Sequence, residues 1–254
     1  MVPDYNVLSM ISMNNFKKIV HYLHLDELFD SIKECHNDNR GGFLIPTSSK
    51  VTDSEYARYR HLPINWTLAP ITKDDLPDEF SPQAVKTVDM FRRKTIDLSY
   101  ECMIYFDYIS GKIVACSFSD KNSPDEVHGV VYSYLLKRMH IASIHNHPIQ
   151  YCSPPFGKNF EMLGLEFEEF EIISSQHELW ILESRKIVLD EDRLNKLRKK
   201  FDDSLNSYFD EVMPNFEEGY LILDNVNEGY GNFLLNYLNK KCDKVKLTKR
   251  CLND

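Results

Sequence analysis

The sequence lacks the features of a membrane or secreted protein. No apolar run among its 254 residues approaches the roughly 20 that a membrane helix needs. The first residues, Met1 to Tyr5, contain no basic segment followed by an apolar one, so we expect no secretory signal. The six cysteines are widely scattered, with no Cys-x-x-Cys pair. This usage predicts reduced thiols in the cytoplasm rather than a disulfide framework.

An excess of positive charge is also missing. The chain has 30 Lys and Arg against 39 Asp and Glu, a formal net charge of -9. Because phosphate contacts need clustered Lys and Arg, we expect no nucleic-acid partner, and we expect no membrane association either. The content of 43% hydrophobic and 27% charged residues is ordinary for a globular protein. The length allows one large domain or a core domain with flanking extensions.

The pattern of the chain divides it into three regions: a mixed, mainly helical region over 1–95, a central region over 96–187, and a helix-rich C-terminal extension over 188–254. In the first region, an apolar stripe from Phe16 to Ile32 predicts a helix that ends at Gly41-Gly42. An irregular, proline-containing stretch follows. Ser81-Pro82 then predicts the start of a second helix.

The central region alternates strand and helix patterns. We expect strands at 103–106 and 113–115, an amphipathic helix from Asp125, a buried strand at 141–144, a short helix near Asn159, and a hairpin of 170–173 with 179–182. In the third region we expect a helix from Leu194 that stops at Pro214, a strand at 220–223, and a helix around 233–235. These elements predict an α+β fold whose mixed sheet is sandwiched by helices, with helical flanking regions.

Two histidines directly follow the buried strand at 141–144. His145 and His147 are two residues apart, so an extended backbone points both side chains to the same side. Imidazole is a common zinc ligand, and two converging imidazoles provide part of a divalent metal site. Pro148 then fixes the exit of the chain.

The order of these features resembles the JAMM (MPN-type, also called JAB) metallopeptidase domain. That family has an upstream Glu, then His-x-His-Pro, then a Ser and an Asp a few residues apart. Here Glu101 precedes a strand, a hairpin, a helix and a buried strand, which leads into His145-Asn146-His147-Pro148. The Asn between the histidines is similar to short prokaryotic members. The resemblance covers 96–187 and implies a fold of the JAMM and cytidine-deaminase-like type.

The resemblance also implies an activity and its residues. His145 and His147 would bind one Zn²⁺ per chain, which lowers the pKa of a bound water toward ~7. Glu101 would take a proton from that water and pass it to the leaving amine. Ser153 would support the oxyanion. The implied reaction is hydrolysis of a peptide or isopeptide bond, in a polypeptide or ubiquitin-like conjugate lying along a sheet edge beside the metal.

The chain departs from the family after Pro148. Ser153 comes earlier than the family's serine, and the position of the expected Asp falls on Phe156. An alternative alignment assigns the third metal ligand to Asn159, whose neutral amide oxygen binds zinc more weakly than a carboxylate; Glu161 is another candidate. The consequences to choose between are weak zinc binding, a changed metal, or an inactive site. The second hypothesis is therefore a JAMM-like protein-interaction scaffold without catalysis.

Overall fold

The computed structural model describes residues 25–44, 50–60, 68–124, 127, 135, 140–148, 154–155, 157–175, 177–185, 188–217, 223–241 and 245–252. Its strands are β1 (Gly42–Leu44), β2 (Cys102–Asp107), β3 (Ile113–Phe118), β4 (Ile141–Asn146), β5 (Glu168–Ser174), β6 (Glu178–Glu183) and β7 (Lys246–Cys251). Its helices are α1 (Leu25–Asn37), α2 (Asp53–Arg60), α3 (Pro82–Thr95), α5 (Glu191–Glu217) and α6 (Leu223–Lys241), with 3-10 turns η2 (Lys73–Asp75) and η3 (Gly157–Gly164).

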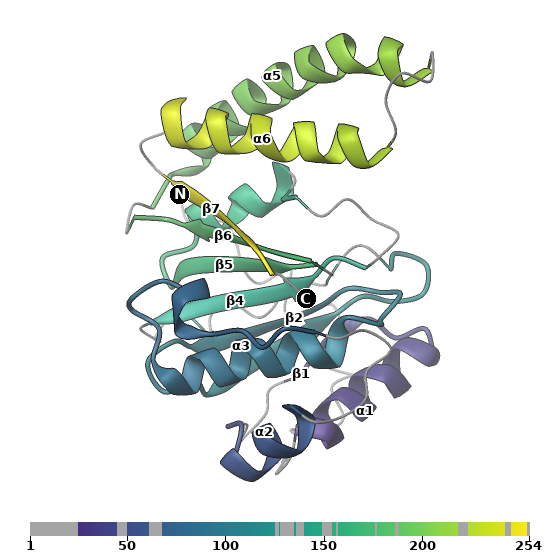
Figure 1. The fold of residues 1–254 in the computed structure, drawn as a ribbon, viewed down its shortest axis with the longest axis vertical. Coiled ribbons are helices and arrows are strands. Elements are labelled where there is room, and N and C mark those ends of the chain that lie inside the picture. Colours follow the sequence, from purple (N-terminus) through teal and green to yellow (C-terminus); the bar gives the residue numbers. More distant parts are fainter. Residues whose placement is uncertain are drawn as a thin grey trace.

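The strands form one seven-stranded sheet in the order β1-β3-β2-β4-β5-β6-β7 (Figure 1). Strands β4 and β5 pair in parallel, whereas the other neighbouring strands described pair antiparallel. The expected α+β class with a mixed sheet is confirmed. Strand β4, which carries the histidines, is the fourth of the seven and lies in the middle of the sheet.

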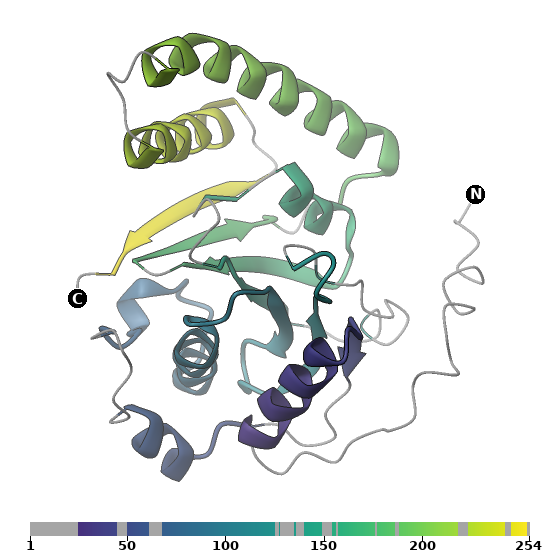
Figure 2. The ribbon, with the colours of Figure 1, turned by 90° about the vertical axis from the view of Figure 1, so that its right-hand side faces the viewer.

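Helices pack on the sheet through two large apolar clusters, and Figure 2 shows α1 and α3 on one side of the strands and α5 and α6 on the other. One cluster joins α1 and α3 to β2–β6, with Phe80 and Phe91 among its largest buried side chains. The other joins η3, α5 and α6 to β5–β7 around Trp180. Along β5 the two clusters alternate, Ile172 in the first and Ile173 in the second. They therefore occupy opposite faces of the sheet.

Most of the expected elements in the described residues are present. Ser81 caps α3 by accepting a hydrogen bond of 3.1 Å from the amide of Ala84, with Pro82 in the first turn. The strands expected in the central region match β2–β6, and the short helix near Asn159 is η3. The helix expected from Asp125 falls mostly outside the described residues, as does the first helix up to residue 24.

Four local expectations were wrong. The stretch expected to be irregular contains α2, and the helix expected to stop at Pro214 continues to Glu217. Leu223, expected to end a strand, begins α6. Strands β1 and β7 were not expected. These two strands bring the first and third regions of the chain into the same sheet as the central region.

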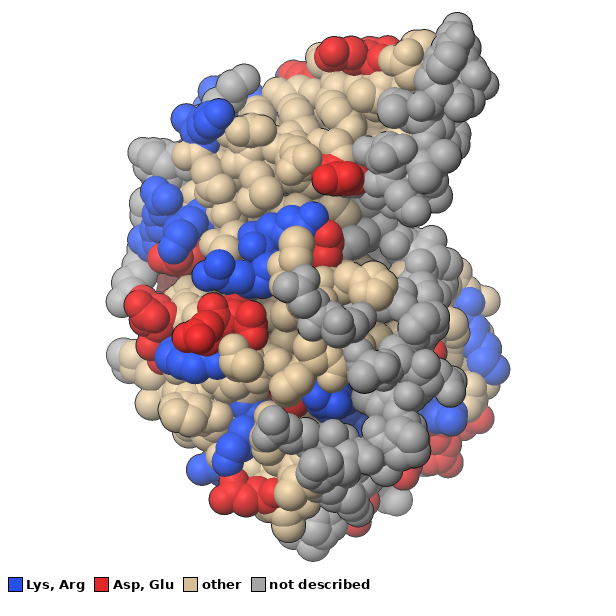
Figure 3. Space-filling model, in the orientation of Figure 1, with Lys and Arg blue, Asp and Glu red and all other residues tan. Residues whose placement is uncertain are grey.

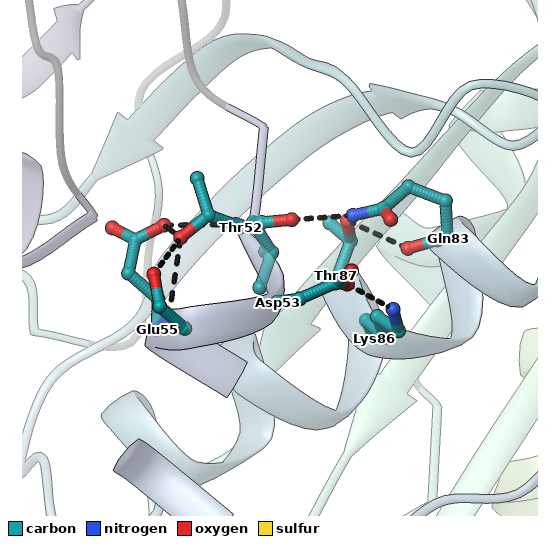
Figure 4. Close-up of polar contacts among 8 residues, drawn as sticks. Thr52, Asp53, Glu55, Gln83, Lys86 and Thr87 are labelled. Carbon is teal, nitrogen blue, oxygen red and sulfur yellow. Dashed lines mark hydrogen bonds and ion pairs between the residues drawn. The ribbon is translucent and has the colours of Figure 1, made fainter. Parts of the chain in front are cut away.

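A capping box begins α2 and holds it against α3 (Figure 4). The amide of Thr52 donates to Glu55 Oε2 at 2.8 Å, and the amide of Glu55 donates to Thr52 Oγ1 at 3.2 Å. Lys86 of α3 forms an ion pair with Asp53, and Gln83 donates to a backbone carbonyl just before α2. Exchanged bonds of this kind satisfy helix-end amides without needing an apolar face.

The edge strand β7 carries Lys246, Lys249 and Arg250, and Figure 3 shows basic side chains gathered where this strand runs, beside acidic ones. Lys249 lies 2.5 Å from Glu178, on the neighbouring strand β6. Charged side chains on an edge strand oppose edge-to-edge pairing with another chain. No helix in the described part of the chain combines the length and the apolar character needed to cross a membrane.

Candidate metal site

Strand β4 delivers His145 to the interior of the molecule. All six residues of the strand are buried, and so is His147, which follows it. Alternation places Ser143 and His145 on one face of the sheet. The amide of His147 donates to the carbonyl of Ser174 on β5 at 2.9 Å, so the chain keeps its course beside β5 beyond the end of β4.

The two imidazoles converge through their Nε2 atoms, which lie 3.2 Å apart. Two nitrogens bound tetrahedrally to zinc at roughly 2.0–2.1 Å would be about 3.3 Å apart. The spacing of the pair therefore fits a shared metal ion. Burial, and then the nearby His147, lower the pKa of His145 well below its ordinary value. His145 is thus neutral near pH 7, the form of imidazole that binds a metal.

Glu171 and Asn159 complete the surroundings of His145. Glu171 is on β5, opposite Ser143 in the parallel register, and its Oε1 lies 3.4 Å from Nδ1 of His145. The same Oε1 accepts a hydrogen bond of 2.9 Å from Nδ2 of Asn159. That amide nitrogen is 3.5 Å from Nε2 of His145. One carboxylate thus contacts both a candidate ligand and the residue expected as the third ligand.

Asn146, between the two histidines, holds the backbone on either side of Glu101. Its Oδ1 accepts from the amide of Cys102 at 2.8 Å, and its Nδ2 donates to the carbonyl of Tyr100 at 3.0 Å. In the antiparallel register of β2 and β4, Met103 is opposite His145. Glu101 directly precedes β2, two residues before Met103, and an extension of this register by two residues would place it opposite His147.

A second buried carboxyl group lies further along the same row. Glu168, at the start of β5, accepts a hydrogen bond from the Ser143 hydroxyl. Burial raises the pKa of Glu168 to about 7, and the bond from Ser143 opposes that rise. Burying a polar group in an otherwise apolar layer is unfavourable unless the group is hydrogen-bonded. Ser143 and Glu168 satisfy one another, next to His145 but without contacting it in any described interaction.

The structure brings together several of the residues expected from the sequence. Nε2 of His145 lies within hydrogen-bond range of both His147 and Asn159, and Glu101 directly precedes β2, the strand that pairs with β4. Ser153 lies outside the described residues, and so does the side chain of Glu161. Within the described part of the chain, no group of three or more His, Cys, Asp and Glu side chains is arranged to hold a metal ion.

Glu171 is the member of this arrangement that sequence reasoning missed. A signal was present, because a single Glu interrupts the apolar run Phe170, Ile172, Ile173 on a strand that is buried except at Glu169. Its proximity to His145, however, depends on the parallel pairing of β5 with β4. Comparison with family models, with curated proteins and with solved structures finds no significant match for this chain.

Proposed function

We propose that this protein is a zinc-dependent hydrolase that cleaves a peptide or isopeptide bond. The observation that carries the proposal is the pair of buried imidazoles of His145 and His147, whose Nε2 atoms lie 3.2 Å apart. Contact of His145 Nδ1 with Glu171 supports it, because the outer nitrogen of a metal-binding histidine usually meets a carboxylate or carbonyl.

The donor set fits zinc, with one weak member. His145 and His147 would hold the ion through Nε2, and Asn159 would add a neutral amide oxygen after a turn of its side chain, which now presents nitrogen to His145. A bound zinc ion would supply Lewis-acid activation of water near neutral pH. Since Asn159 brings no negative charge, we propose that the affinity is lower than that of a site with three charged or imidazole ligands.

Glu101 is proposed as the group that moves the proton. It is held at the start of β2 by the two hydrogen bonds of Asn146 to the adjacent residues, so its backbone is fixed relative to His147. A carboxylate placed there would accept a proton from the attacking water and return it to the leaving amine. Ser153 keeps its proposed role in supporting the oxyanion.

The substrate is proposed to be a polypeptide or a ubiquitin-like conjugate. Because β4 is the central strand and β1 and β7 are the edges of the described sheet, neither edge is next to the histidines. We therefore revise the expected approach: the scissile bond would reach the site over the end of β4, where the chain turns at Pro148, rather than along a sheet edge.

The test is hydrolysis of fluorogenic peptides and of isopeptide-linked ubiquitin-like conjugates by the full chain, with and without a chelator. Activity should require the metal and fall at least about 100-fold in Glu101→Gln, the lower end of the range for a general acid-base group. The exposed Glu79→Gln is the matched control and should retain activity. Full activity in Glu101→Gln would refute the assigned role.

The scaffold hypothesis also has an observation in its favour. Asn159 directs an amide nitrogen toward His145, and no carboxylate joins the pair as a third ligand within the described residues. A scaffold would neither bind zinc nor hydrolyse any substrate in the assay above. In that case, His145 and His147 would be a buried polar pair that serves packing alone.

A further inference from the structure

We propose that Glu171 is a positioning residue: it fixes the His145 tautomer that can bind a divalent metal and holds Asn159 beside that ring in the metal-free protein. The inference extends the proposed function and rests on it for the identity of the metal. The tautomer of His145, however, is a property of the protein without metal and can be measured independently.

The carboxylate of Glu171 is buried among apolar side chains. Glu171 is 4% exposed and lies between the buried Phe170 and Ile172. A carboxylate in such a place is unfavourable unless donors surround it. Asn159 Nδ2 is one donor, at 2.9 Å. Nδ1 of His145 lies 3.4 Å from the same oxygen, close enough for a favourable electrostatic interaction.

The surroundings of His145 determine which of its ring nitrogens carries the proton. Nδ1 of His145 is buried and makes no hydrogen bond to any described residue. In neutral imidazole one nitrogen carries the proton and the other a lone pair. A proton on Nδ1 would be attracted by the negative charge of the Glu171 carboxylate, whereas that charge would repel a lone pair at the same position. Nδ1–H is therefore the favoured tautomer, and it leaves the Nε2 lone pair directed toward His147.

A single oxygen of Glu171 lies close to both His145 and Asn159. Oε1 of Glu171 contacts His145 and Asn159 together, so it sets the position of the amide relative to the imidazole. Asn159 comes from η3, which follows β4 in the order of described elements and packs on β5. Glu171 thus connects the strand that carries the histidines to the segment that carries the third candidate ligand.

Glu168 provides a matched control on the same strand. It is 3% exposed, is also a glutamate, and lies three residues before Glu171. Its partner is the Ser143 hydroxyl rather than a histidine. Glu171→Gln and Glu168→Gln therefore make the same chemical change in similar surroundings, and only the first alters the contact with His145.

The experiment records the ¹⁵N chemical shifts of the His145 ring in the metal-free full chain, with the signals assigned by their loss in His145→Gln. The wild-type ring should be predominantly the Nδ1–H tautomer. Glu171→Gln should shift the population toward Nε2–H, and Glu168→Gln should leave it unchanged. A wild-type ring that is predominantly Nε2–H overturns the inference without any variant, as does an equal response of the two variants.

Zinc affinity, measured by competition with a chromogenic chelator, is the second readout. Removing a carboxylate behind a metal-binding histidine typically weakens binding 10–100-fold. We expect that loss in Glu171→Gln and less than about a threefold change in Glu168→Gln. If the wild type binds no zinc, the proposed function fails, while the tautomer still decides the role of Glu171. If zinc binds and Glu171→Gln leaves both the tautomer and the affinity unchanged, the inference fails alone.

Discussion

Replacing Glu168 with glutamine should remove a pH-dependent loss of stability. The pKa of Glu168 rises from 4.5 to about 7 in the folded protein because the carboxyl is buried. Below pH 4.5 the group is protonated in the folded and the unfolded chain, and the native state keeps its full stability. As the pH rises toward 7, the unfolded chain loses this proton while the folded chain retains it, so the free energy of unfolding falls.

The magnitude follows from the same shift. One pKa unit corresponds to about 1.4 kcal/mol, so a rise from 4.5 to about 7 corresponds to a loss of about 3 kcal/mol above neutral pH. Glutamine does not titrate and can still hydrogen-bond to Ser143. The free energy of unfolding of Glu168→Gln, relative to that of the wild type, should therefore rise by about 3 kcal/mol between about pH 4.5 and pH 8.

Urea denaturation at several pH values, with both proteins measured under identical conditions, gives this difference directly, because other titrating groups contribute to both. Ser143→Ala is an informative second variant. It removes the hydrogen bond that lowers the pKa of Glu168, so its loss of stability should extend to higher pH than in wild type. A difference between Glu168→Gln and wild type that does not vary with pH would refute the reasoning.

Two further substitutions test buried polar interactions, one beside the candidate site and one on α3. Asn146→Ala should lower the free energy of unfolding by about 2–4 kcal/mol, since it leaves two buried backbone groups beside Glu101 unpaired, and a loss below about 1 kcal/mol in chemical denaturation would contradict this. Asp89→Ala should cost about 3–5 kcal/mol, because the buried Arg93 loses its carboxylate partner at 2.9 Å. A loss below about 1 kcal/mol, again by denaturation, would show that this ion pair contributes little.

The sequence predicted those elements whose apolar pattern was strong. The short apolar runs in β2–β6 and the cap of α3 are local signals, and they were read correctly. Helix α2 has no apolar stripe, but its capping box, Thr52 and Glu55, was present in the sequence and was overlooked. Strand β7 could not be recognised from its own residues, because it is rich in basic side chains and is stabilised by pairing with β6.

The candidate site was predictable in part for a similar reason. His145 and His147 are close in sequence, so their convergence follows from backbone alternation alone. Glu171 and the two hydrogen bonds of Asn146 depend on which strands are neighbours and in which register. Such pairings join residues that are 26 or more positions apart along the chain, and no local pattern encodes them.

The most direct test of the proposed zinc site is the metal content of the full chain, purified without a metal-affinity tag and measured by elemental mass spectrometry. We predict about one zinc ion per chain, lost in His145→Ala/His147→Ala. The absence of bound metal in the wild type, even after zinc is added back, would contradict the proposed hydrolase and favour the scaffold.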